Sequence, residues 1–378
     1  MFSTLLLIFL SLALFYEILS LPLSGLLKFI LIVAEMYTVS FVLSKKYDLS
    51  TEMGFLLLKS KKGIAIIDKL AKNAKLWNFF ADVGTVISYG LLSVLLFKKQ
   101  FSWKSLLAGL AILSVLSFLV APFSLHFLSS VLTTSFEKKA AISFGNDNLA
   151  SLLFLVVMYA GGFFSLILLG IFYYGAHIAI LLFNFLIFGQ QTITTTQPGG
   201  TFLLPGINLP LLEGVLALAI VLIVHEGSHA VLSRIASIPL LSSGIVLFGI
   251  IPIGAFVEPD EKKLVRLEQV KQTRILVAGS TANFITSVLF FIIFVCAALV
   301  MPLLPAGFFY DAFKFLYVVF GLTFSLNFVV ATVNLLPLPL FDGYRILELN
   351  VKNRTLVKAI MYATIGAFLL NFVPWLFI

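Results

Sequence analysis

This chain of 378 residues has little charge, little histidine and almost no cysteine. Only 11% of its residues are charged and 61% are hydrophobic, whereas an ordinary soluble domain carries about 25% charged residues. This composition excludes a soluble globular domain and indicates a protein that lies in a lipid bilayer. Cys296 is the single cysteine, so no disulfide can form within the chain.

What the chain has instead is a series of long apolar runs without charge. Runs of about eighteen residues or more suffice to cross roughly 30 Å of hydrocarbon, and long runs without alternation favour helices over a barrel. We therefore predict an all-α polytopic membrane protein with about eight to ten transmembrane helices. The predicted spans are 2–20, 25–44, 80–97, 105–123, 149–188, 211–233, 274–301, 313–336 and 358–377. The run 149–188 exceeds one upright span, so it is either one tilted helix or two helices broken near Gly161 and Gly162.

Three regions follow from this pattern. Residues 1–97 form an N-terminal membrane region, whose lysine-rich segment 45–79 is predicted to be cytoplasmic and to contain amphipathic pieces on the membrane surface. Residues 98–197 form an additional membrane region. Residues 198–378 contain all the motifs that carry chemistry and are predicted to be the catalytic core.

The distribution of basic residues predicts the sidedness of the second half. A net charge of +8 could suggest a nucleic-acid ligand, but the lysines and arginines fall in loops between spans, which is the orientation signal of membrane proteins. Loop 189–210 has no charged residue and is predicted to face outward, whereas loop 234–273 and segment 343–358 are basic and are predicted to be cytoplasmic. His225 then lies toward the cytoplasmic end of its span.

Segment 242–258 is apolar but rich in glycine and proline. Its β-branched and aromatic residues favour a short β-hairpin over a helix. Non-helical backbone at membrane depth must be buried in protein or line a wet cavity. An exposed strand edge at this place could pair with an extended substrate.

The sequence His225-Glu226-Gly227-Ser228-His229 lies inside one of the apolar runs. Two histidines four residues apart lie on one face of a helix and can bind the same metal ion. Glu226 follows the first histidine and can act as a general base toward water at that metal. Because strongly polar residues in a span are costly, by about 2.5–3.5 kcal/mol for an ionised one, chance is a poor explanation for this pattern.

A catalytic zinc needs a third protein ligand, and Asp342 is a candidate. It follows Pro337 and Pro339, which break the preceding helix, and it precedes Gly343, which permits a close turn. Taken alone, Asp342 could equally be an ordinary aspartate at a helix end. The predicted topology places it on the same side of the membrane as His225, which favours ligation.

The segment from Gly279 to Asn283 opens the span after the basic loop. Small residues allow helices to approach closely, and an asparagine amide can bond across a helix interface. From the residues alone, helix packing is the favoured interpretation of Asn283.

Together these residues resemble the site-2 protease family of intramembrane zinc metalloproteases. The matching pieces are HEGSH at 225–229, the Gly-x-x-x-Asn element at 279–283 and the Asn-x-x-Pro…Asp-Gly element at 334–343. PGINLP at 205–210 and the segment 244–258 look like the eukaryotic and archaeal branch. Many relatives carry a PDZ-like domain between the last two elements, but only residues 302–312 lie between the corresponding spans here.

The resemblance implies a zinc ion held by His225, His229 and Asp342, with Glu226 as the catalytic base. It also implies that Asn283 and Asn334 hold the substrate backbone extended near the metal. The expected partners are the lipid bilayer and a transmembrane helical protein substrate, with no nucleic acid. The expected location is an archaeal-like cell membrane, with the zinc near the cytoplasmic side.

The predicted function is therefore hydrolysis of a peptide bond in or near a transmembrane segment, as in regulated intramembrane proteolysis. One alternative is a metal or ion transporter that uses the same ligands as a transit site, although we find no duplicated halves. The other is an inactive, protease-like membrane binding protein, although all four expected site residues are present.

Overall fold

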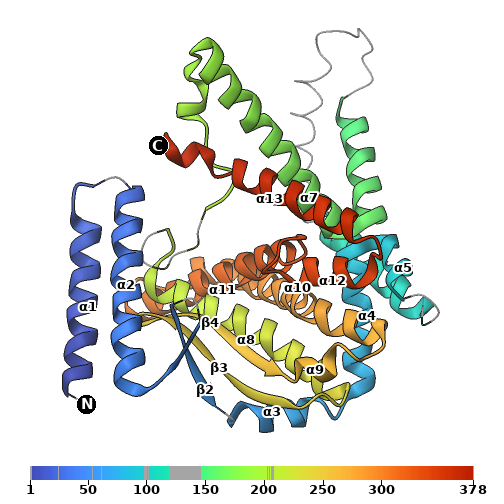
Figure 1. The fold of residues 1–378 in the computed structure, drawn as a ribbon, viewed down its shortest axis with the longest axis horizontal. Coiled ribbons are helices and arrows are strands. Elements are labelled where there is room, and N and C mark those ends of the chain that lie inside the picture. The colour runs from blue at the N-terminus through green and yellow to red at the C-terminus, as the bar shows by residue number, and fades with distance from the viewer. Residues whose placement is uncertain are drawn as a thin grey trace. The chain divides into compact units, whose positions relative to one another are not determined.

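The computed structural model describes residues 2–377 except 24, 53, 61, 98–99, 101, 119–145, 202, 204 and 206–207. The chain forms two compact units (Figure 1). The first unit comprises residues 1–72, 202–264 and 286–327, and the second comprises 73–201, 265–285 and 328–378. Two helices, α10 (Gln269–Val300) and α11 (Phe308–Val333), contribute residues to both units.

Six helices in the described part of the chain are long and apolar enough to cross a membrane. They lie within Ser3–Ser20, Ala74–Phe97, Leu152–Phe188, Leu211–Ile235, Gln269–Leu303 and Phe308–Val333. The prediction of a helical, multi-pass membrane protein with a small β element is confirmed. The predicted spans 25–44, 105–123 and 358–377 are also helical, over Gly25–Tyr47 (α2), Trp103–Phe118 and Arg354–Leu370 (α13), but are not among the six. Residues 119–123 lie outside the described residues.

The first unit contains a four-stranded antiparallel sheet. Its strands are β1 (Ser50–Glu52), β2 (Phe55–Ser60), β3 (Leu240–Phe248) and β4 (Ile251–Pro259), in the order β1-β2-β3-β4. The predicted hairpin near 242–258 is therefore present as β3 and β4. The strands β1 and β2 were not predicted, because a short apolar run such as FLLLKS has no period that distinguishes strand from helix. Their partner strand β3 lies far away in the sequence.

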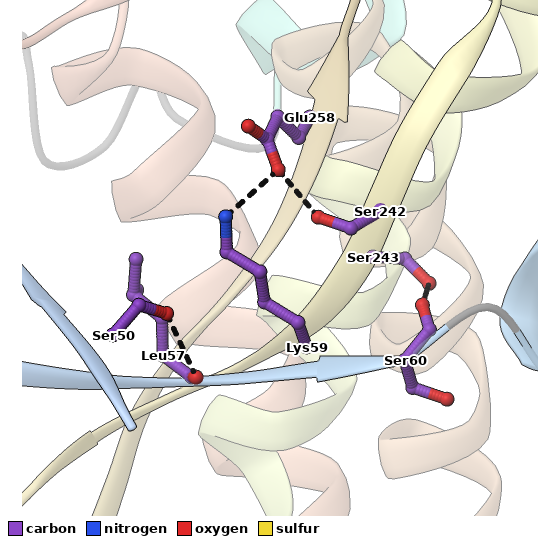
Figure 2. Close-up of polar contacts among 7 residues, drawn as sticks. All are labelled: Ser50, Leu57, Lys59, Ser60, Ser242, Ser243 and Glu258. Carbon is purple, nitrogen blue, oxygen red and sulfur yellow. Dashed lines mark hydrogen bonds and ion pairs between the residues drawn. The ribbon is translucent and has the colours of Figure 1, made fainter. Parts of the chain in front are cut away.

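Polar side chains connect the strands of this sheet at the end opposite the β3–β4 turn (Figure 2). The Lys59 ammonium lies 3.1 Å from the Glu258 carboxylate, which also accepts a hydrogen bond from the Ser242 hydroxyl at 2.5 Å. These two interactions, the Ser242 hydrogen bond first, lower the pKa of the Glu258 carboxyl below its usual value. The ion pair of Lys59 and Glu258 therefore links β2 to β4 across the intervening strand β3.

Helix α2 packs against the strands β2 and β3 in this unit. Helix α8 (Leu211–Ile235) packs against β4, and the short helix α3 (Lys62–Leu70) packs against α8 and β3. The Arg234 guanidinium, near the end of α8, lies 2.6 Å from the Asp68 carboxylate on α3. Helix α3 is amphipathic and packs against α8, and its location on the membrane surface stays a prediction.

The second unit is built on α4 (Ala74–Tyr89) and α7 (Asn146–Phe188). Helix α7 breaks at Gly162, with φ 59° and ψ −155°, so the second of the two predicted alternatives for this run is the correct one. The break lies against another at Gly90, with φ 52°, just after α4. A Cβ atom on Gly162 would come within 2.5–2.6 Å of backbone atoms of Ile87 and Ser88, so only glycine fits.

The part of α10 in the second unit packs closely on α4. A Cβ on Gly84 would overlap the Thr281 side chain at 1.7 Å, so this glycine allows the two helices to touch. Beside this contact, the rings of Phe163, Phe284 and Phe328 form a cluster with centroids 4.9–6.0 Å apart. These contacts fix the helix that carries Asn283.

Candidate metal centre

The two histidines of the motif lie on consecutive turns of α8. Their Nε2 atoms are 3.2 Å apart and their ring centroids 4.8 Å apart. His225 is buried, with 6% of its surface exposed, and His229 is half-buried. The Ser228 hydroxyl donates a hydrogen bond to the His225 carbonyl at 2.7 Å, so it is bonded to its own helix.

The spacing of these two nitrogens agrees with a shared metal ion. Zinc binds histidine nitrogen at about 2.0–2.1 Å with tetrahedral geometry, so two such nitrogens lie about 3.3 Å apart. The 3.2 Å between the Nε2 atoms of His225 and His229 is close to that value. The spacing of four residues on a helix therefore brings the two ring nitrogens together on one face, as predicted from the sequence.

Asp342 opens helix α12 (Asp342–Asn350) after the break that follows α11. Helix α11 ends at Val333, before Pro337 and Pro339, as predicted from the prolines. The Gly343 N–H donates to the Asn334 carbonyl at 2.8 Å, and a Cβ on Gly343 would come within 2.0 Å of the Leu335 carbonyl oxygen. Gly343 therefore permits the close return of the chain that its position after the two prolines predicts.

Among the described residues, His225, His229 and Asp342 form a group that could hold a metal ion. Each offers one ligand atom, and these atoms lie within 4.8 Å of one another. Two imidazole nitrogens and one carboxylate oxygen are a common donor set for catalytic zinc, and they leave a coordination position open.

The other predicted site residues have different surroundings. Glu226 is half-buried on α8, directly after His225. Asn283 is fully buried within α10, and Asn334 is half-buried at the end of α11, where its carbonyl accepts the Gly343 N–H. A buried amide at membrane depth requires hydrogen-bond partners, but this requirement does not by itself assign a role in substrate binding.

One buried ion pair was not found by sequence reasoning. Asp82 on α4 receives two hydrogen bonds from Arg274 on α10, at 2.6 and 2.9 Å, and their side chains are only 9% and 17% exposed. In the sequence, Asp82 lies in the apolar run 80–97, and Arg274 opens the run 274–301. Because 192 positions separate them, no local pattern could have paired them.

Comparison with known proteins supports the resemblance found in the sequence. Residues 213–315 match the family model described as Peptidase family M50. This stretch contains the histidine motif and Asn283, but it ends before Asp342. No curated protein and no solved structure matches the chain.

The matched stretch covers α8, the β3–β4 hairpin, α10 and the start of α11. Six candidate spans and this match together support an integral, multi-pass membrane protein with a metallopeptidase-type site. Over residues 213–315, the chain is thus similar to Peptidase family M50.

Proposed function

We propose that this protein is an intramembrane zinc metalloendopeptidase that hydrolyses a peptide bond in or near a transmembrane segment of a membrane-protein substrate. The observation that carries the proposal is the donor group of His225, His229 and Asp342, two of whose residues lie in a candidate membrane span. Polar side chains inside a membrane-spanning helix cost free energy. Their presence there therefore favours a function within the bilayer over that of a soluble hydrolase.

We propose zinc as the metal and these three residues as its ligands. Imidazole nitrogen with one carboxylate oxygen suits zinc better than magnesium or calcium, which prefer oxygen ligands alone. When bound, zinc would polarise the substrate carbonyl and activate water near neutral pH.

Glu226 is the proposed catalytic base. It follows His225 directly on α8, and its side chain is half-buried. The Glu226 carboxylate accepts a proton from the attacking water and later passes it to the leaving amine. Removing only this proton acceptor should lower the rate by about 10²- to 10⁴-fold.

The substrate has to be unwound before it is cut, because a helix hides its peptide bonds in backbone hydrogen bonds. Strand β4 packs against α8, and it is the last strand of the sheet, so one of its edges has no strand partner among the described residues. We propose that this edge pairs with the unwound substrate, and that Asn283 and Asn334 help to hold its backbone extended.

The proposed location of the zinc is near the cytoplasmic side of the membrane, in a cell of archaeal type. The basic loop 234–273 follows the motif helix directly, and basic loops remain in the cytoplasm. Cleavage at this depth would release a cytoplasmic fragment of the substrate, which is the chemistry of regulated intramembrane proteolysis.

The test uses full-length protein purified in detergent. We expect about one zinc per chain, cleavage of a transmembrane peptide by the wild type, and loss of cleavage with retained zinc in Glu226→Gln. The matched control is Glu213→Gln, which changes a glutamate in the first turn of the same helix and should leave the rate unchanged. Zinc flux into liposomes without cleavage would instead favour a transporter, and cleavage by Glu226→Gln at the wild-type rate would exclude the proposed base.

A second experiment tests the hairpin. Deletion of residues 247–256 should reduce turnover of a helical substrate, because its edge strand would be lost, while zinc content remains near normal. Unchanged turnover of the helical substrate would refute the role of β4.

A further inference from the structure

The tip of the β3–β4 hairpin is held by helix α2, which belongs to the N-terminal region and contains none of the predicted site residues. The turn at residues 249–250 joins Phe248 to Ile251, which pair in the sheet. Its Gly249 N–H donates a hydrogen bond to the Ser40 hydroxyl at 2.7 Å. Both residues are buried, Ser40 with only 1% of its surface exposed.

The fit at this tip depends on glycine for two independent reasons. Gly249 has φ 62°, at the turn position where a two-residue hairpin of type II′ requires glycine. A Cβ at Gly249 would also lie 2.5 Å from the Met36 sulfur and 3.1 Å from the Met36 Cα. The turn and α2 therefore lie so close together that no side chain fits between them at position 249.

Apolar contacts extend this attachment along α2. Met36 and Ile32 form a buried cluster with Ile18 of α1 (Phe2–Ser20), against which Phe248, Ile250 and Ile251 pack. A second cluster, of Val39, Leu43 and Leu56, receives Leu247 and Ile250. Helix α2 therefore contacts the tip of the hairpin, and it also packs against α1 and β2.

We propose that Ser40 and Met36 are positioning residues for substrate binding: they fix the hairpin tip so that β4 stays in place to pair with an unwound substrate segment. This inference rests on the proposed function, in which β4 receives the substrate. Strand β2 pairs with β3 as far as Leu247, so the tip beyond it is a two-stranded ribbon, which is only marginally stable by itself. A strand that must first become ordered binds its partner more weakly. Attachment to α2 removes that ordering step before the substrate arrives.

The test compares Ser40→Ala with Ser44→Ala in the full-length protein. Ser44 lies one turn further along α2, and its hydroxyl donates a hydrogen bond to the Phe41 carbonyl of its own helix. The probes are a leucine-rich transmembrane peptide and the same peptide with two central glycines, which is already partly unwound. Removing the acceptor leaves the buried Gly249 N–H unsatisfied, so Ser40→Ala should raise KM for the leucine-rich peptide about five- to tenfold with little change in kcat. The effect on the glycine-containing peptide should be smaller, and Ser44→Ala should behave as the wild type.

A second measurement does not depend on activity. Hydrogen–deuterium exchange of the segment around Gly249 should become faster in Ser40→Ala and remain unchanged in Ser44→Ala. Equal losses on both peptides, or unchanged exchange at the tip, would overturn the inference and leave Ser40 as a residue of general stability. The deletion of residues 247–256 separates this result from the proposed function: if the deletion impairs cleavage but Ser40→Ala does not, β4 acts without the α2 attachment. If the deletion has no effect, the substrate role of β4 itself is wrong.

Discussion

At the scale of single residues, the chemistry depends on side chains that are costly to place in a membrane. His225 is buried in an apolar helix, and its Nε2 atom lies 3.2 Å from that of His229. Two imidazole nitrogens this close can share one proton or one cation, and under the proposed function they share a zinc ion with the Asp342 carboxylate. Each proposed ligand can therefore be tested by its own substitution.

Asp342→Ala should lower zinc affinity by at least about 100-fold, because a carboxylate ligand contributes both charge and one of three protein bonds. Affinity is measured by competition with a chromophoric chelator in detergent. The control is Asp311→Ala, an exposed aspartate in the first turn of α11, which should bind zinc as the wild type does. Wild-type affinity in Asp342→Ala would remove this residue from the site.

The buried pair of Asp82 and Arg274 makes a second prediction at this scale. Arg274→Met should destabilise the protein by about 3–5 kcal/mol, because it leaves a buried carboxylate without its partner. The double variant with Asp82→Asn should recover much of that loss. Arg354→Met breaks an exposed pair with Glu348 and should cost about 1 kcal/mol or less. Thermal unfolding in detergent ranks the variants, and a double variant less stable than Arg274→Met would contradict the account.

At the scale of elements, two helix breaks and one hairpin determine how the membrane region is built. At Gly90 and Gly162, two chain segments are in backbone contact with each other. Gly249 allows the hairpin tip to pack directly against α2. Each of these glycines has a positive φ and a close neighbour, so each is fixed by both backbone conformation and space.

Gly162→Ala should therefore destabilise the protein by about 2–4 kcal/mol, from the left-handed conformation and the overlap with the backbone near Ile87. Gly170→Ala, on the same helix α7, introduces a methyl group with no described atom within 4 Å and should be neutral or slightly stabilising. Thermal unfolding of the two variants measures the difference. Equal midpoints would show that the break in α7 does not need glycine.

At the scale of the whole molecule, the features that the sequence predicted are those with a local signal. The apolar runs predicted the helices, the glycine- and proline-rich segment predicted the hairpin, and the spacing of His225 and His229 predicted their shared face. The strand β2, the pair of Asp82 with Arg274 and the contact of Ser40 with Gly249 join residues far apart in the chain. Such pairings arise from tertiary packing and leave no periodic pattern in either partner.

The orientation in the membrane is a further prediction at this scale. In a Cys296→Ser background, a cysteine at Lys262 should react with a membrane-impermeant maleimide only from the cytoplasmic side. A cysteine at Thr195, in the uncharged loop 189–210, should react only from the outside. Labelling of both positions from the same side would refute the predicted topology of the motif helix.

The central claim is that two histidines of one transmembrane helix and an aspartate further along the chain bind one zinc ion that the reaction requires. X-ray absorption at the zinc edge of the active, full-length protein tests it most directly. We predict about one zinc per chain, with two imidazole nitrogens and carboxylate oxygen in its coordination shell at about 2.0–2.2 Å. A fully active preparation without bound metal, or a zinc ion whose spectrum contains no imidazole, would contradict the claim.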